Sequence, residues 1–179
     1  MLNRSIMPHE LPATLDHIER AVCAALIRLD KNWWRFPKTD GAWTRAVKNS
    51  VGSIGHKRGY LVCAASSKFE RNGEWVFDMG WFKMRGDIIV DVPLALESEW
   101  GVSGAMDDFQ KLLISRARHR VMVLWSRKHP PAEGLISSLI RQVAKYQGSQ
   151  RGDRYLFCCW VENPAQLFFH SHVVGARVD

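Results

Sequence analysis

The stretch EWVFDMGWFKMRGDIIVDVPLALESEWGVSGAMDDFQKLLISRARHRVMVLW, residues 74–125, decides the expected fold. Apolar runs broken by turn residues indicate strands, and apolar residues at helical spacing indicate a helix between them. The predicted elements are, in order, a strand over 75–82, a tight turn at 83–87, a strand over 88–100, a helix over 105–118 and a strand over 120–125. Pro93 lies inside the second strand and predicts an edge position or a bulge, because proline cannot donate to the ladder.

The flanking segments extend the same pattern. They predict helices over 13–29 and 42–54, a strand over 60–66, a helix over about 133–146, and strands over 155–162 and 166–174. The glycines of GSIGHKRG are expected to end the second helix. The first three strands should form an antiparallel meander, and the strand–helix–strand unit that follows predicts a mixed sheet.

The expected fold class is α/β (α+β), a mixed β-sheet with helices on both faces. A chain of 179 residues suits a single domain, 1–179. Within it we distinguish N-terminal helices (1–58), a core (59–126), and a C-terminal helix with two strands (127–179).

Composition bears on compartment and partners. No apolar run reaches the length of a membrane helix, and the N-terminal segment lacks the apolar core of a secretory signal, so we expect no membrane partner and a cytoplasmic location. The cysteines form no CxxC pair and are expected to be reduced thiols, as is usual in the cytosol: Cys23, Cys63, Cys158 and Cys159.

The charge of the chain is segregated along its length. The formal net charge is +7, which favours a polyanionic partner. Residues 41–69 and 109–132 carry basic side chains and no acids, while most residues with charge between them are acidic. An enzyme that acts on nucleic acid needs this arrangement, with acids for a cation and bases for phosphates. The candidate nucleic-acid-binding residues are Lys48, Lys57, Arg58 and Arg116.

Three carboxylates mark the candidate site. Asp78 is expected inside an apolar strand, and Glu97 and Glu99 lie at the end of the next one. Alternation places Glu97 and Glu99 on one face, roughly 6.6 Å apart. If the strands pair, the three carboxylates would form a site for Mg²⁺ (or Mn²⁺). Lys111, on the following helix, would add a positive charge near a phosphate.

A plainer interpretation stands beside this one. The carboxylates would then be solvated positions on half-exposed strands. Lys111 would form only a helical ion pair with Asp107 or Asp108, which precede it by one turn.

The pieces FDMGW, LALESEW and DFQKLL, in this order, resemble the PD-(D/E)XK nuclease superfamily, which has the restriction-endonuclease-like fold. The resemblance covers residues 60–125 and implies Mg²⁺-dependent hydrolysis of phosphodiester bonds, with DNA as the expected substrate. It implies that Asp78 and Glu97 bind the metal. Glu99 stands where the family has its lysine and would bind metal or orient water, and Lys111 is the candidate for a lysine moved to the helix.

Two departures from the family pattern keep other functions open. Phe77 precedes Asp78 where the motif has proline, and Glu99 replaces the lysine. The chain could therefore be a non-catalytic nucleic-acid- or protein-binding module on the same fold, or a domain whose acidic patch is only an interaction surface. Glu19 could match an extra helical acid of some family members. A homodimer is also open, because cutting two strands often uses a symmetric dimer.

Overall fold

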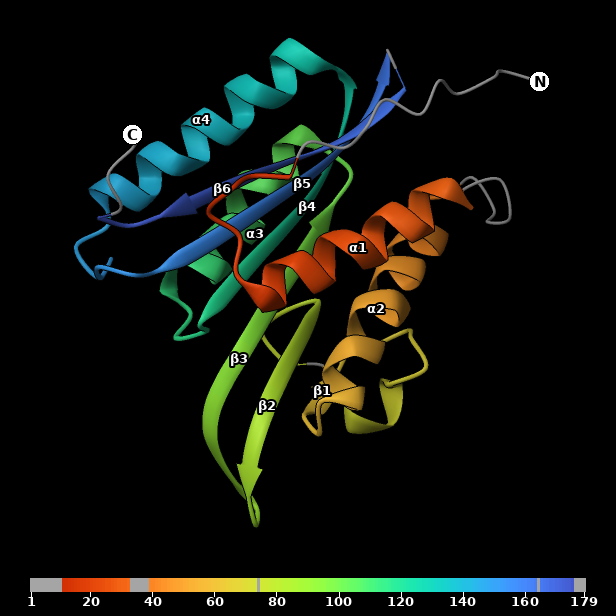
Figure 1. The fold of residues 1–179 in the computed structure, drawn as a ribbon, viewed down its shortest axis with the longest axis vertical. Coiled ribbons are helices and arrows are strands. Elements are labelled where there is room, and N and C mark those ends of the chain that lie inside the picture. The colour runs from red at the N-terminus through yellow and green to blue at the C-terminus, as the bar shows by residue number, and fades with distance from the viewer. Residues whose placement is uncertain (1–10, 33–38, 74, 164, 176–179) are drawn as a thin grey trace.

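The structure is a computed structural model that describes residues 11–32, 39–73, 75–163 and 165–175. Part of the segment compared with a secretory signal lies outside these ranges. The elements are α1 (His17–Lys31), α2 (Asp40–Lys57), β1 (Leu61–Cys63), the 3-10 turn η2 (Glu70–Asn72), β2 (Met79–Arg85), β3 (Ile88–Glu99), α3 (Val102–Ile114), β4 (His119–Lys128), α4 (His129–Lys145), β5 (Arg154–Asn163) and β6 (Gln166–Val173) (Figure 1).

The strands form a six-stranded mixed sheet whose spatial order, β1-β2-β3-β4-β5-β6, follows the chain. The first three strands pair antiparallel, which confirms the predicted meander. Helices α3 and α4 are the crossovers that make β3, β4 and β5 parallel, and β6 returns antiparallel. The predicted α/β class with a mixed sheet is confirmed.

Helices cover both faces of the sheet, as predicted. Helices α1 and α2 lie on one face, and α3 and α4 lie on the other (Figure 1). Alternation along β3 supplies both cores: Leu94 and Leu96 pack towards α1 and α2, whereas Ala95 packs towards α3 and α4. By the same alternation, Glu97 lies on the face covered by α3, and like its neighbours along β3 it is buried.

Helix α2 runs through Gly52 and Gly55 but ends, as expected, at a glycine of this segment, because Gly59 follows the C-cap Arg58 with a φ of +79°. It reaches Lys57 instead of residue 54, so the predicted C-terminus is wrong. A Cβ atom at Gly55 would lie 2.6 Å from the indole of Trp81, and one at Gly52 would lie 2.5 Å from the ring of Phe69. The glycines let α2 approach β2 closely, and burial of the aromatic rings offsets their poor helix propensity.

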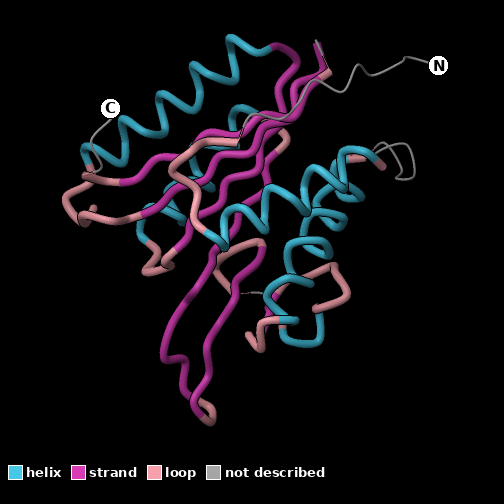
Figure 2. Tube along the Cα trace, in the orientation of Figure 1, coloured by secondary structure: helices cyan, strands magenta, loops and turns pink. Residues whose placement is uncertain are grey.

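Pro93 lies in an interior strand, so the edge alternative is wrong and the bulge alternative is confirmed. Trp81 pairs with Leu94 and Lys83 pairs with Asp91, which leaves one extra residue on β3 between the two pairs. The register of β3 with β4 begins only at Leu94. Residues 83–92 consequently extend beyond the body as a two-stranded ribbon (Figure 2).

Helix α1 begins at His17, later than predicted, because Asp16 is its N-cap. Asp16 accepts hydrogen bonds from the Ile18 and Glu19 amides, and the Glu19 carboxylate accepts one from the Asp16 amide.

Among the helices of the described ranges, none has both the length and the hydropathy of a membrane-spanning segment.

Candidate functional site

Asp78 and Glu97 lie side by side where β2 begins and β3 ends. Asp78 is one residue before β2, so the expectation that it sits inside the strand is wrong. Met79 pairs with Leu96, which brings the preceding Asp78 next to Glu97. The Asp78 amide donates to Glu97 Oε2 at 3.4 Å, and the Ser98 amide donates to Asp78 Oδ2 at 2.9 Å. These two hydrogen bonds hold the two carboxylates next to each other, where the start of β2 adjoins the end of β3.

Glu97 is the most perturbed acid of this site. Its side chain is 2% exposed, and its Oε1 atom accepts no hydrogen bond from the described residues. Burial, followed by the negative charges of Asp78 and Asp108, raises the pKa of Glu97 from 4.5 to about 8, although Lys111 and the Asp78 amide act in the opposite direction. Such a group is costly to keep in a fold and is characteristic of functional sites.

Lys111 reaches this pair from α3. Its Nζ atom lies 3.6 Å from Glu97 Oε1 and 2.7 Å from Asp108 Oδ1, one turn earlier on the same helix. The hydrogen bond from Lys111 to Asp108, together with the nearby carboxylates, raises the pKa of Lys111 despite partial burial. The helical ion pair and the contact with the candidate site are therefore both present.

Lys48 reaches the pair from α2, on the opposite face of the sheet. Its side chain is 6% exposed, and its Nζ atom lies 3.2 Å from Asp78 Oδ1 and 3.3 Å from the Ala65 carbonyl oxygen. We expected Lys48 on a surface that binds nucleic acid. The structure instead places it inside the protein as the counter-ion of Asp78.

Glu99 is not brought into this arrangement. Its Oε1 atom accepts a hydrogen bond of 2.6 Å from the Gly101 amide, and its carboxylate packs against Gly104 in the first turn of α3. Glu99 shares a strand face with Glu97, as predicted, but its carboxylate turns back to the N-terminal end of α3, where a negative charge is favourable.

The predicted phosphate-binding residues divide into two groups. Lys57, Arg58 and Arg116 are exposed, at the end of α2 and after α3. Arg120, from the second acid-free segment, is buried and donates to the Leu112 and Ser115 carbonyl oxygens. Part of the basic segments is therefore structural and does not form a surface for phosphates.

Sequence reasoning missed Lys48 and Asp108 as members of this site. A signal for Lys48 was present, because it follows Val47 and precedes Val51 by three positions on the apolar stripe of α2. A lysine on the border of a buried stripe predicts a partner within the fold. For Asp108 the helical spacing to Lys111 was visible, but the position of Glu97 across the interface was not.

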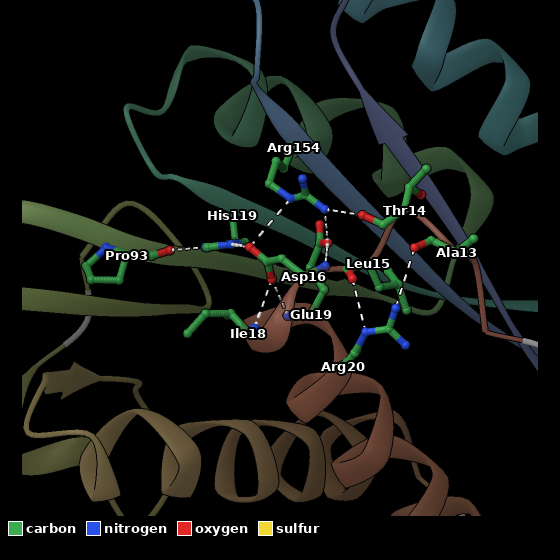
Figure 3. A network of polar contacts seen from close by, with 10 residues as sticks. All are labelled: Ala13, Thr14, Leu15, Asp16, Ile18, Glu19, Arg20, Pro93, His119 and Arg154. Atoms are coloured by element: carbon green, nitrogen blue, oxygen red, sulfur yellow. Dashed lines mark hydrogen bonds and ion pairs between the residues drawn. The ribbon is translucent and has the colours of Figure 1, made fainter. Parts of the chain in front are cut away.

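A second polar cluster lies where β4 begins, and we call it the clasp: Asp16, Glu19, His119 and Arg154 (Figure 3). His119 Nε2 lies 2.7 Å from Asp16 Oδ2, and Arg154 contacts both acids. Glu19, which could have matched an extra catalytic acid, is engaged by Arg154 and by the Asp16 amide. The clasp fastens the start of α1 to β4 and β5.

The donor set of Asp78 and Glu97 fits a hard divalent cation. Both supply carboxylate oxygens, and Glu97 Oε1 is buried and accepts no hydrogen bond from the described residues, with the Lys111 ammonium 3.6 Å away. Mg²⁺ commonly uses one or two carboxylates and keeps several waters. Within the described ranges, no three side chains of the His, Cys, Asp and Glu types gather as a metal-binding group.

The chain was compared with protein-family models, with curated proteins and with solved structures, and none of the three comparisons finds a match.

Proposed function

We propose that this protein is a Mg²⁺- or Mn²⁺-dependent nuclease of the PD-(D/E)XK type that hydrolyses phosphodiester bonds in DNA. The observation that carries the proposal is the pairing of Asp78 with Glu97 at adjoining strand ends, with a buried glutamate oxygen that accepts no hydrogen bond from the part of the chain that the structure describes. The antiparallel meander followed by a parallel crossover agrees with the resemblance seen in the sequence.

Each side chain has a role in this proposal. Asp78 and Glu97 would hold the cation, which would supply Lewis acidity and lower the pKa of a bound water. Lys111 would stabilise negative charge on the phosphate, a role supported by its Nζ atom at 3.6 Å from Glu97 and by a side chain that is 42% exposed. Glu99 would join the ligands or orient water only after its carboxylate leaves the Gly101 amide.

The proposal extends to partners and compartment. The exposed Lys57, Arg58 and Arg116 would contact the nucleic-acid backbone, so binding should weaken steeply with salt. A homodimer would bring two such sites to the two strands of a duplex. All four cysteines are buried and free, as suits a cytoplasmic protein.

The direct test incubates the purified protein with duplex DNA, single-stranded DNA and RNA, each with Mg²⁺, with Mn²⁺ or with EDTA. We expect metal-dependent cleavage that Asp78→Ala abolishes. Asp87→Ala is the matched control, because Asp87 is an exposed aspartate in the turn between β2 and β3. The proposal is wrong if no nucleic acid is cleaved, or if Asp78→Ala cleaves as fast as the wild type.

A non-catalytic nucleic-acid-binding module is the second candidate. The ion pairs Lys48–Asp78 and Lys111–Glu97 favour it, because they compensate the carboxylates without any metal. This protein would bind DNA with the same affinity in EDTA as in Mg²⁺ and would leave it intact. Fluorescence anisotropy with labelled DNA, read beside the cleavage assay, separates the two functions.

A further inference from the structure

Two ammonium groups approach the carboxylate pair from opposite faces of the sheet. Lys48 comes from α2 and contacts Asp78 at 3.2 Å, and Lys111 comes from α3 and contacts Glu97 at 3.6 Å. Each candidate metal ligand therefore already has a cation of the protein's own. The border position of Lys48 on α2 indicated a buried partner, but not that this partner is Asp78, which lies 30 positions later in the chain.

Lys48 is held too firmly to be an incidental surface contact. It lies on the same helix as Val47 and Val51, which are both fully buried, and its ammonium also donates to the Ala65 carbonyl oxygen. A buried ammonium group is expensive unless compensated, and an apolar side chain of similar size often serves stability equally well. The position of Lys48 beside Asp78 is thus better explained by the chemistry of the site than by the stability of the fold.

The formal charges of this site are nearly balanced without a metal. With Glu97 ionised, as a metal ligand would be, Lys48 and Lys111 stand against Asp78, Glu97 and Asp108, so the five side chains sum to a single negative charge. A divalent cation would turn this into a single positive charge in a largely buried place, which is unfavourable on its own. One phosphodiester anion beside the cation would bring the sum to zero.

We propose that Lys48 is a built-in counter-ion of Asp78 that makes binding of a divalent cation weak until a phosphodiester is also bound. This inference rests on the proposed function and adds a coupling between the two ligands. The coupling is reciprocal, so the cation strengthens phosphodiester binding by the same factor. The site then binds the divalent cation tightly only when nucleic acid is bound as well.

The test measures Mn²⁺ affinity by isothermal titration calorimetry, with Mn²⁺ alone and with saturating phosphorothioate DNA that resists cleavage. Lys48→Met removes the charge and retains most of the buried side-chain volume. Lys145→Met is the matched control, because Lys145 is an exposed lysine at the end of α4. Circular dichroism and thermal melting establish that each variant is folded, and Lys48→Gln replaces Lys48→Met if the latter does not fold.

We expect phosphorothioate DNA to tighten Mn²⁺ binding to the wild type by about tenfold or more. In Lys48→Met, Mn²⁺ alone should bind about tenfold more tightly than in the wild type, and DNA should add little. Lys145→Met should behave as the wild type does. The affinity of DNA, measured by anisotropy, should change with Mn²⁺ by the same factor.

The inference is overturned if folded Lys48→Met binds Mn²⁺ alone no more tightly than the wild type, or if DNA leaves the Mn²⁺ affinity of the wild type unchanged. Cleavage of DNA by the wild type, scored separately, shows whether the proposed function itself holds. A wild type that cleaves DNA but shows no coupling refutes only this inference. A wild type that neither binds Mn²⁺ nor cleaves refutes both.

Discussion

The backbone amide of Asp78 donates to the carboxylate of Glu97 at 3.4 Å across the β2–β3 pair. The buried Glu97 is therefore held beside the half-buried Asp78 by the main chain of Asp78 itself. The arrangement satisfies Glu97 Oε2 and leaves Glu97 Oε1 without a hydrogen bond among the described residues. Burial and the neighbouring negative charge of Asp78 raise the pKa of Glu97, so its ionised form is costly, and this cost can be measured.

Glu97→Gln should remove a pH-dependent loss of stability. The folded state raises the pKa of Glu97 from 4.5 to about 8, so between these values the folded protein retains a proton that the unfolded chain has released. The free energy of unfolding of the wild type, relative to Glu97→Gln, should fall by roughly 4 kcal/mol between pH 4.5 and pH 8.5 and change little above that. Urea denaturation at pH 5, 7 and 8.5, in EDTA, measures this difference.

The matched control is Glu70→Gln, which changes an exposed glutamate in η2. Its stability relative to the wild type should not depend on pH in this range. A constant difference between Glu97→Gln and the wild type from pH 5 to pH 8.5 would contradict the account of Glu97.

Lys111→Met should slow cleavage without weakening DNA binding in proportion. Lys111 contributes one positive charge beside Glu97, where negative charge would develop on the phosphate. Loss of one such group costs about 10²–10³-fold in kcat where it stabilises a transition state. Single-turnover cleavage and anisotropy measure the two effects, with Lys145→Met as the control. Equal rates for Lys111→Met and the wild type would leave Lys111 with only its ion pair to Asp108.

Asp16→Asn should destabilise the clasp but preserve the cap of α1, because asparagine is as good an N-cap as aspartate. Burial alone would raise the pKa of Asp16. Hydrogen bonds from the Glu19 amide, His119 and the Ile18 amide outweigh burial and lower this pKa from 3.8 to about 2. The stabilisation is therefore complete above pH 4 and is lost as the pH falls through 2.

Because the Asp16 side chain is 30% exposed, we expect the difference at pH 7 to be only about 1 kcal/mol. Urea denaturation of Asp16→Asn and the wild type at pH 7 and pH 2.5 measures it, and the difference in stability between the two proteins should be clearly smaller at the lower pH. Asp87→Asn, in the exposed turn between β2 and β3, should have the same free energy of unfolding as the wild type at both pH values. A larger difference in stability between Asp16→Asn and the wild type at pH 2.5 than at pH 7 would contradict the lowered pKa of Asp16.

Gly55→Ala should destabilise the fold, although alanine is the better helix former. Its Cβ atom would lie 2.6 Å from the indole of the fully buried Trp81, so the ring or α2 must move, at a cost of about 1–3 kcal/mol. Gly41→Ala, in the first turn of the same helix, meets nothing within 4 Å and should be neutral or stabilising. Thermal melting of both variants tests the pair, and equal melting temperatures would refute the packing argument.

Most of the fold was predictable because its signals are local. The two periodicities, near 2 for strands and 3.6 for helices, were sufficient for the element order and for the mixed sheet. The errors fall where distant residues overrode local preference. Trp81 lets α2 continue through Gly55, and a bulge lets β3 carry Pro93 in an interior strand.

The candidate site was only partly predictable. Asp78 and Glu97 could be paired because hairpin strands are close in sequence and the alternation of β3 fixes the face of Glu97. The direction of the Glu99 carboxylate could not be predicted, because it depends on where the first turn of α3 presents its amides. Lys48 was assigned to a surface, because composition records its charge but not its burial.

The amino-acid sequence by itself determined the secondary elements, their order and the two acids that meet between β2 and β3, because these depend on side-chain polarity within short segments. Only the tertiary structure decided which cations compensate those acids, and that the clasp joins Asp16 to His119, because such contacts depend on how layers far apart in the chain pack against one sheet. The charge of the site is a property of that packing and not of any one segment.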